Sequence, residues 1–337
     1  MKNLTRRQLF KETAMASAAA LLFSSGCAPA AKYAKPAAVK AFPAAPKSTV
    51  VRARHAGVWS GDALQPAVLT QLLDASITKL TGQNDALQAW KSVFRPTDKI
   101  AIKVNTIEGS IDWTHVPLVN AVVARLLAAG FPGEQLFVFD RHAYELTGAG
   151  FTINQDGPGA RLVGTDGDYT SGIPLLDTKV GISNILMNCD ALINMPLVKQ
   201  HMYAGVSFSI KNHYGTFDSP DDFHYGQRIE QGLAELNALP AIKDKTRLII
   251  GDALVVVLGD NWTSEEKNDS IFMSFNPVAT DTYALKLLAE TKAAKGADES
   301  VIAEYTAKAK PWLAHAVELG LGTADPGKID YQELKLG

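Results

Sequence analysis

Short apolar runs rich in β-branched residues alternate along this chain with longer segments in which apolar residues recur with a helical period. Runs of the first kind are typical of strands, and segments of the second kind are typical of amphipathic helices. The expected strands are Thr49–Arg54, Lys99–Val104, Leu136–Phe139, Ala191–Asn194, Val206–Ile210, Arg247–Ile250 and Ser270–Phe275. The expected helices are Gln65–Lys79, Val116–Ala129, Pro277–Glu290 and Glu299–Leu319. The alternation predicts an α/β fold with a mostly parallel or mixed β-sheet flanked by helices, in a single large domain.

One helix has clear boundaries, and one long segment has no period at all. Pro117 falls in the first turn of the helix expected from Val116, and Gly130 follows its end, which is the usual asymmetry of helix termini. The segment Gly148–Asp177 is rich in glycine and aspartate. We expect it to be a long excursion over the edge of the sheet.

The N-terminal residues carry a targeting signal. Arg6 and Arg7 stand directly before an apolar stretch from about Ala14 to Phe23. This predicts a twin-arginine signal peptide over residues 1–30, read by the twin-arginine translocase, and a location in the periplasm or otherwise outside the cytoplasmic membrane. The stretch is roughly ten residues long, short of the ~20 that a membrane-spanning helix needs. We therefore expect no transmembrane helix in the mature protein.

Two processing sites compete at the end of this signal. Cys27, after Gly26, fits a lipoprotein site, whereas Ala28 to Ala30 fits the small-x-small rule of ordinary signal peptidase. We favour lipidation of Cys27, and a lipid anchor is then the protein's expected contact with the membrane. Residues 31–47 are rich in alanine and proline and read as a tether, which leaves residues 48–337 as the α/β domain.

Charge and cysteine content exclude several classes of function. Lysine and arginine total 33 and aspartate and glutamate total 35, with a formal net charge of -2 and no long basic run, so we expect no nucleic-acid binding. Of the two cysteines, Cys189 alone remains if Cys27 is lipidated or removed. One thiol cannot build an intramolecular disulfide or an iron–sulfur cluster, and we expect Cys189 to be a buried structural residue.

Polar residues follow four of the expected strands. They are Asn105 after the second strand, Asp140 after the third, Asn194 with Lys199 and His201 at and beyond the fourth, and Asp252 after the strand that ends at Ile250. Ligands of open α/β sheets bind outside the carboxyl ends of the strands. We therefore expect these side chains to converge on one crevice.

Two lysines lie in apolar surroundings. Lys103 lies inside an expected strand and Lys211 directly follows the run Val206–Ile210. An embedded lysine needs a carboxylate partner or an anionic ligand. Asp140, Asp252 and Asp281 are candidates for the first role, and a carboxylate or phosphate on a small anionic ligand is the candidate for the second.

The middle of the chain has a distinctive order of polar residues. Residues 193–201 read INMPLVKQH and residues 205–215 read GVSFSIKNHYG. This resembles the N-x-P-x-x-K-x-H … G-V-x-x-x-x-K-N-x-x-G block of the domain-of-unknown-function family DUF362. Residues 103–105 (KVN) and 276–281 (NPVATD) are similar to two weaker motifs of that family, the second of which usually begins with aspartate rather than Asn276. The resemblance spans roughly residues 50–288.

The resemblance implies a fold more than a reaction. Many members of that family carry ferredoxin-like cysteine clusters, which this chain lacks, so an iron–sulfur cluster is not expected here. The positions that match the family's motifs are Lys103, Asn105, Asn194, Lys199, His201, Lys211, Asn212 and Asp281.

A metal site is a further hypothesis. His201, His213 and His224 fall within one stretch that also contains Asp218, Asp221 and Asp222. Histidine and aspartate suit zinc, manganese or iron(II), so a divalent metal is a candidate cofactor with the three histidines as ligands. The spacings match no standard metal motif, however, and the three aspartates also fit an ordinary acidic turn.

Two functions follow from these residues. The first is an enzyme in which Lys103, Lys199 and Lys211 hold an anionic small molecule and His201 or Asp140 moves a proton. Its expected ligand-binding residues are Asn105, Asn194, Asn212, Asp252 and Asp281. The alternative is a non-catalytic periplasmic binding lipoprotein whose lysines hold an anion. Replacing His201 by alanine discriminates between them, because an enzyme keeps binding and loses turnover.

Overall fold

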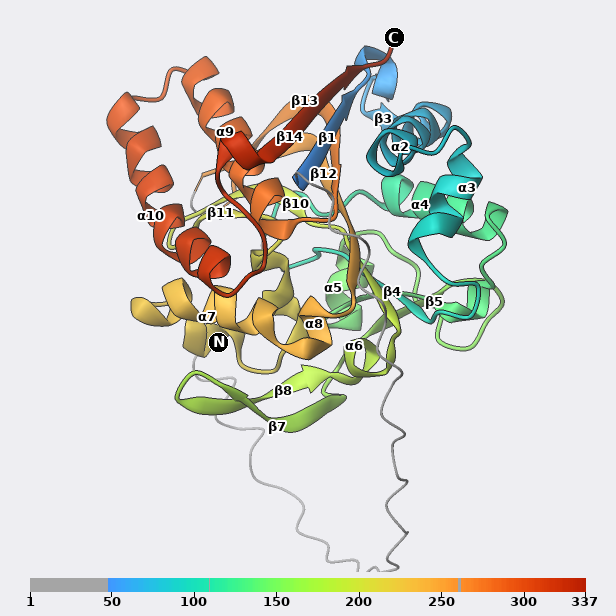
Figure 1. The fold of residues 1–337 in the computed structure, drawn as a ribbon, viewed down its shortest axis with the longest axis horizontal. Helices are drawn as coiled ribbons and strands as arrows, with labels where there is room; N and C mark the ends of the chain where they lie inside the picture. Colours follow the sequence, from blue (N-terminus) through green and yellow to red (C-terminus); the bar gives the residue numbers. More distant parts are fainter. Residues whose placement is uncertain (1–47, 109, 260–261) are drawn as a thin grey trace, which may run out of the picture. The chain divides into compact units, whose positions relative to one another are not determined.

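A mixed β-sheet runs through the part of the chain that the computed structural model describes, residues 48–108, 110–259 and 262–337 (Figure 1). Its strand order is β14-β1-β13-β12-β9-β4-β5-β6, with β10 beside β12 and β11 beside β10. The strands of this sheet are β1 Ser48–Arg54, β4 Ile100–Lys103, β5 Leu136–Asp140, β6 Arg161–Gly164, β9 Ala191–Asn194, β10 Leu197–His201, β11 Gly205–Ser207, β12 Thr246–Leu258, β13 Ser264–Ser274 and β14 Ile329–Lys335. Two hairpins lie outside it, β2 Trp59–Ser60 with β3 Ala63–Leu64 and β7 Tyr169–Leu175 with β8 Thr178–Ser183.

The sheet is parallel on one side and mixed on the other. From β12 through β9, β4, β5 and β6 every neighbouring pair is parallel, whereas β13 pairs antiparallel with both β12 and β1. All residues of β4 and β9 are buried. Parallel strands covered on both faces are expected to be apolar throughout, which is why these two appear in the sequence as continuous runs. The expected fold class is confirmed.

Helices cover both faces of the sheet (Figure 1). One apolar core packs helices α2, α3 and α4 against the sheet around Trp90, and the other packs α7, α9 and α10 around Trp312. The helices are α2 Pro66–Thr81, α3 Ala86–Val93, α4 Val116–Ala128, α5 Ala143–Gly148, α6 Asn184–Asn188, α7 Gln227–Ala238, α8 Pro240–Lys243, α9 Pro277–Ala294 and α10 Glu299–Glu318. The described residues form one compact unit.

Local signals set the ends of two helices. Helix α4 has Pro117 in its first turn and is followed by Gly130 with a φ of 92°, as its sequence predicts. Helix α9 begins after Asn276, whose side chain accepts a hydrogen bond from the N–H of Ala279 at 2.9 Å. Asn276 is therefore a helix cap, a role that asparagine performs as well as aspartate does.

Two strand predictions are corrected by the structure. The expected strand Val206–Ile210 ends at Ser207, because the carboxylate of Asp281 accepts the N–H groups of Ser209 and Ile210 and turns the chain into the 3-10 helix η3 Lys211–Thr216. The strand expected to end at Ile250 continues to Leu258, so Asp252 lies inside β12 rather than at its end.

The aperiodic segment Gly148–Asp177 contains strand β6, which pairs with β5 at the sheet edge, and strand β7. Every residue of β6 is only partly buried, so this strand has no apolar run that would reveal it in the sequence. Helices α3 and α7 and strand β14 were also not anticipated.

The predicted targeting signal, Cys27 and the predicted tether lie within residues 1–47, outside the described residues. Within residues 48–108, 110–259 and 262–337, no helix combines the length and the apolar character needed to span a bilayer. Cys189 is buried, as predicted, and burial raises the pKa of its thiol to about 11.

Candidate functional site

A cavity of about 100 Å³ opens at the carboxyl ends of β4 and β5. Strands β10 and β11, helix η3 and the following 3-10 helix η4 Pro220–Phe223 complete its wall. The cavity is lined by Lys103, Asn105, Ile107, Asp140, Arg141, Glu145, Lys199, His201, Ser207, Lys211, Asn212, Tyr214, Gly215, Pro220, Asp221, His224 and Trp262. Lys199 and His201 are two residues apart on β10, so the strand period directs both to the same face.

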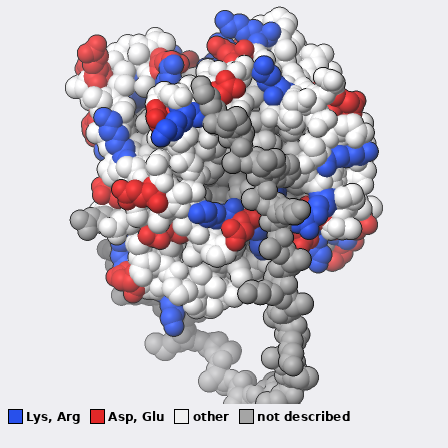
Figure 2. Space-filling view, viewed as in Figure 1, with Lys and Arg blue, Asp and Glu red and all other residues white. Residues whose placement is uncertain are grey.

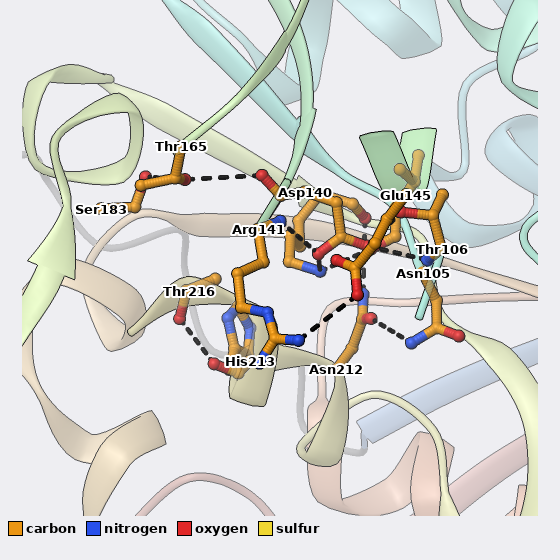
Figure 3. Close-up of polar contacts among 12 residues, drawn as sticks. Asn105, Thr106, Asp140, Arg141, Glu145, Thr165, Ser183, Asn212, His213 and Thr216 are labelled. Atoms are coloured by element: carbon orange, nitrogen blue, oxygen red, sulfur yellow. Dashed lines mark hydrogen bonds and ion pairs between the residues drawn. The ribbon is translucent and has the colours of Figure 1, made fainter. Parts of the chain in front are cut away.

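A buried ion pair forms the floor of this cavity. Lys103 Nζ lies 2.6 Å from Asp140 Oδ1, and both side chains are almost fully buried. Burial lowers the pKa of Lys103, and the Asp140 carboxylate opposes that effect. Asp140 also accepts hydrogen bonds from the N–H and hydroxyl of Thr106 and from the N–H of Arg141 (Figure 3). With both oxygens occupied, Asp140 fixes Lys103 rather than offering a free base.

Arg141 and Glu145 form a second ion pair in the wall, one helical turn apart. Arg141 Nη2 donates to Glu145 Oε1 at 3.3 Å (Figure 3). The same Glu145 oxygen accepts the N–H of Glu108 at 3.3 Å, and Glu145 is buried. Neither residue was a candidate from the sequence, although Arg141 directly follows Asp140 at the strand end.

A chain of side-chain amides lies beside Lys103. Asn105 Nδ2 donates to Asn212 Oδ1 at 3.3 Å, and Asn212 Nδ2 donates to Asn194 Oδ1 at 2.7 Å. Asn194 Nδ2 in turn donates to the carbonyl of Ser209 at 2.8 Å and lies 3.3 Å from His213 Nε2. Because a carbonyl can only accept, the Ser209 contact sets the orientation of all three amides.

His213 lies behind this amide chain and does not line the cavity. Burial, reinforced by the charge of Lys103, lowers the pKa of its imidazole to about 3. His213 is therefore neutral at physiological pH, and it supports the cavity wall from within the core.

Lys199 is a buried amine with a small set of contacts. Its Nζ donates to Ser110 Oγ at 2.8 Å and lies 5.4 Å from the centre of the Trp262 ring. Burial lowers the pKa of Lys199 to about 7, even though Asp112, Asp140 and Asp252 pull it upward. Among the described residues, no carboxylate forms an ion pair with this amine.

Lys211 has equally apolar surroundings. Its Nζ lies 3.6 Å from the centre of the Tyr214 ring and 3.0 Å from His224 Nε2. His224 Nδ1 lies 2.8 Å from the carbonyl of Pro220, so Nδ1 carries the proton and Nε2 accepts from Lys211. Burial lowers the pKa of Lys211 well below its usual value. No carboxylate within the described ranges pairs with it.

His201 is held as a neutral hydrogen-bond donor. Its Nδ1 lies 3.2 Å from the N–H groups of both Tyr203 and Ala204, so Nδ1 accepts and Nε2 carries the proton. Burial, followed by the charge of Lys211, lowers the pKa of His201 well below its usual value. This geometry favours donation from Nε2 over proton abstraction by His201.

The structure separates three of the expected ligand-binding residues, Asn194, Asp252 and Asp281, from the cavity. Asp281 is fully buried beneath the Ser209–Ile210 turn. Asp252 is also fully buried, and its Oδ2 lies 2.8 Å from His115 Nδ1. None of the three side chains lines the cavity, whereas Asn105 and Asn212 do.

The three histidines do not form a metal-ligand set in the described part of the chain. His201 and His224 stack with their ring centres 5.7 Å apart, and His224 is engaged by Lys211 and Pro220. Within residues 48–108, 110–259 and 262–337, no group of three His, Cys, Asp or Glu side chains is arranged to hold a metal ion. A bound divalent metal stays a prediction from the sequence.

Two residues that contact Lys199 carry no signal in the sequence. Trp262 belongs to a turn after β12, and Ser110 belongs to the segment between β4 and α4. Both reach Lys199 only because the chain folds back over the ends of the strands. On the face seen in Figure 2, basic and acidic side chains are interspersed rather than gathered by sign.

The comparisons with known proteins address the fold and the family. No curated protein matches the chain in sequence. The lactate racemase apoprotein from Thermoanaerobacterium thermosaccharolyticum shares 11% identity and a TM-score of 0.38, over 61% of this chain and 52% of that one. A crystal structure of a protein from Thermotoga maritima shares 12% identity and a TM-score of 0.40, over 69% of this chain and 60% of that one. This chain thus spans less than two thirds of the length of both solved structures.

The model of the family described as domain of unknown function DUF362 matches residues 100–286. That range includes every residue of the cavity wall, together with the Asn276 cap and Asp281. It covers more than half of the chain, and this protein therefore belongs to the DUF362 family.

Proposed function

We propose that this protein is an enzyme that binds a small anionic molecule in the cavity and transfers a proton to or from it. The observation that carries the proposal is the pair of buried amines, Lys199 and Lys211, that line the cavity without a carboxylate partner among the described residues. Burying an unpaired ammonium costs several kcal/mol, roughly, so an anion in the cavity would favour the charged form of both lysines.

The neutral His201 supports anion binding of the same kind. Its Nε2–H is the remaining donor of a ring whose Nδ1 is already occupied by two backbone N–H groups. A neutral imidazole can donate to an oxyanion without releasing its own proton. His201 would then orient the anion beside Lys211, the group whose charge affects the pKa of His201 most.

Lys199 is the group best suited to proton transfer. A pKa of about 7 places its amine and ammonium forms in comparable amounts at neutral pH, which is the condition for efficient general acid–base catalysis. Asp140 is occupied by Lys103, Thr106 and Arg141, and His201 lacks a free acceptor nitrogen. We therefore assign the proton-transfer role to Lys199 rather than to Asp140 or His201.

Binding is tested by titration calorimetry of the full chain with sulfate and acetate, which keep their charge across the neutral range. We expect at least one of these anions to bind. Lys211→Met should weaken its affinity about tenfold or more, and Lys179→Met, at an exposed lysine, is the control that should leave the affinity unchanged. If wild type binds neither anion, or if Lys211→Met matches the control, the proposal is wrong.

Turnover is tested separately by proton NMR in D₂O. We expect the protein to catalyse exchange of carbon-bound hydrogen in one or more of a set of small carboxylates, and Lys199→Met to abolish that exchange. Anion binding without exchange in any carboxylate would instead support the alternative, a non-catalytic binding protein.

We further propose that the protein works outside the cytoplasmic membrane after twin-arginine export. The support for this is the Arg6-Arg7 pair before the apolar stretch and the cysteine at position 27. An intact-mass measurement on envelope protein distinguishes a lipid on Cys27 from simple cleavage after Ala30.

A further inference from the structure

The amine of Lys199 is linked to a charged cluster outside the cavity. Lys199 Nζ donates to Ser110 Oγ at 2.8 Å, and Ser110 Oγ donates to the carbonyl of Asp112 at 2.6 Å. Because that carbonyl can only accept, Ser110 must use its own proton there and can only accept from Lys199. The hydroxyl therefore leaves the lone pair of a neutral Lys199 amine free.

His115, three residues after Asp112 in the chain, lies between two carboxylates. Its Nδ1 lies 2.8 Å from Asp252 Oδ2, and its Nε2 lies 3.3 Å from Asp112 Oδ2. Both ring nitrogens must donate to satisfy these contacts, which requires the imidazolium form. Although burial pulls the pKa of His115 down, the two carboxylates raise it to about 10. His115 is therefore charged throughout the neutral range.

Backbone contacts tie this cluster to the sheet. The N–H of His115 also donates to Asp252 Oδ2 at 2.8 Å, and Asp252 lies inside β12. Thr114 Oγ1 accepts the N–H of Asn105 at 2.9 Å and donates to the carbonyl of Met195 at 2.8 Å. Asn105, Thr114 and His115 are thus tied to one another and to the sheet.

We propose that the Asp252–His115–Asp112 cluster controls the protonation of the Lys199 amine through its charges, with His115 offsetting part of the field of the two carboxylates, while the Ser110 hydroxyl accepts a hydrogen bond from that amine. The inference rests on the proposed function only for the role of Lys199 in proton transfer. None of the three charged residues of this cluster lines the cavity.

The charges of the cluster change the protonation of Lys199 in a predictable direction. The charges that act on Lys199 are Asp112, Asp140 and Asp252, which favour the ammonium, and Lys103, which opposes it. His115 is faced by Asp112 and Asp252, and its charge also reaches Glu265. The single positive charge of His115 therefore offsets half of the combined negative charge of Asp112 and Asp252.

Two substitutions should therefore shift the protonation of Lys199 in opposite directions. Asp112→Asn removes a negative charge, so the titration midpoint of Lys199 should fall by about one pH unit. His115→Gln removes the compensating positive charge, so the midpoint should rise by a similar amount, roughly. Loss of a purely structural contact has no reason to give opposite signs.

The experiment measures the reaction of Lys199 with acetic anhydride as a function of pH, in the full-length protein without ligand. Peptide mass spectrometry separates Lys199 from Lys91, an exposed lysine on α3 that serves as the internal reference. Wild type, Asp112→Asn, His115→Gln and Ser110→Ala are compared, with thermal unfolding of each as the check on folding. Ser110→Ala removes an acceptor of the ammonium and should lower the midpoint.

Opposite shifts in Asp112→Asn and His115→Gln, with Lys91 unchanged, support the proposal. Equal midpoints, or shifts of the same sign, overturn it. If His115→Gln does not fold, the test uses Asp112→Asn, at a partly exposed side chain, and Ser110→Ala. An unchanged Lys199 midpoint in either variant then overturns the proposal. Because no substrate is used, failure to find anion binding or proton exchange would overturn the proposed function and leave this result standing.

Discussion

Lys103, Lys199 and Lys211 are three buried lysines in one wall, and their partners give them different chemistry. Lys103 has a carboxylate at 2.6 Å, whereas Lys199 has a hydroxyl and an indole and Lys211 has an imidazole and a phenol ring. A paired lysine keeps its charge and serves as structure, and an unpaired one in a cavity responds to ligand and pH. This difference between neighbours of one residue type is the reason that we propose proton transfer at Lys199.

The pH dependence of anion binding should reveal Lys199. Its ammonium predominates below its pKa of about 7 and is lost as pH rises through that value. We expect the affinity for sulfate, followed by calorimetry, to break near pH 7 and to fall about tenfold for each further pH unit until the complex itself titrates. Lys199→Arg stays charged, so its profile should lack that break. A break that persists in Lys199→Arg assigns it to another group.

Gly215 has no side chain, and this allows the Lys103–Asp140 ion pair to form at the floor of the cavity. A Cβ at this position would lie 2.7 Å from Lys103 Nζ and closer still to Asp140 Oδ1. We expect Gly215→Ala to separate that ion pair, to cost about 1–3 kcal/mol of unfolding free energy and to weaken anion binding. Urea denaturation and calorimetry measure the two effects.

Gly148 provides the matched control for Gly215. It lies at the end of α5, and a methyl group added there would have no atom within 4 Å, so Gly148→Ala should be neutral or stabilise by up to about 1 kcal/mol. Equal effects of the two substitutions would show that the Lys103–Asp140 pair is not sensitive to Gly215.

At the scale of elements, a single carboxylate stabilises the turn between β11 and η3. Asp281, on helix α9, accepts the N–H of Ser209 at 2.7 Å and of Ile210 at 2.9 Å. The turn it holds sets the position of Lys211, the first residue of η3. Asp281 thus affects the cavity through the backbone rather than by contact with a ligand.

Asp281→Asn should destabilise this turn by about 1–3 kcal/mol, because an amide N–H₂ would face a backbone N–H that it cannot satisfy. Burial raises the pKa of Asp281 to about 7, against the two N–H donors, from about 3.8 in the unfolded chain. Between pH 3.8 and about 7, Asp281 holds its proton in the folded state but loses it in the unfolded chain. The contribution of Asp281 protonation to the unfolding free energy is therefore fully present below pH 3.8, roughly, and is lost as pH rises through about 7.

Chemical denaturation across this pH range tests both parts of that expectation. Asp281→Asn should lower the unfolding free energy at acid pH, and its stability should no longer fall as pH rises through about 7. Glu299→Gln, at an exposed carboxylate on α10, should change neither the stability nor its pH profile. A stable Asp281→Asn protein with an unaltered pH profile would contradict the role given to this residue.

At the scale of the whole molecule, the described domain is one α/β unit with its cavity inside the part that matches the family. Charges of both signs are spread over the face in Figure 2, so the anion binding that we propose depends on the few basic side chains that line the cavity rather than on a broad surface field.

Export should depend on the paired arginines. We expect replacement of Arg6 and Arg7 by lysine to leave the precursor in the cytoplasm, because the twin-arginine signal is read by its translocase through that pair. Cell fractionation with immunoblotting measures the distribution, and Cys27→Ser is the control that blocks lipidation while leaving the arginines intact. Periplasmic recovery of the double-lysine variant would contradict twin-arginine export.

The sequence by itself determined the fold class, the family resemblance, seven of the ten strands of the main sheet and four of the nine α-helices among the described residues. Those features depend on local periodicity and on motif residues that lie close together along the chain, such as Lys199 and His201 on one strand face. It also identified the three lysines that the cavity brings together. Lys103 and Lys211 were identified by their apolar surroundings, which are unusual for lysine, and Lys199 by the polar residues beyond a strand end and by the family motif.

Only the tertiary structure decided which polar residues share a site and in what state. Asp252 and Asp281 look equivalent to Asp140 in sequence, yet they are buried elsewhere, against His115 and against a backbone turn. Ser110 and Trp262 reach Lys199 from distant segments. Protonation and hydrogen-bond direction depend on burial and on atoms within a few ångströms, and those neighbours are set by how the whole chain packs rather than by its local pattern.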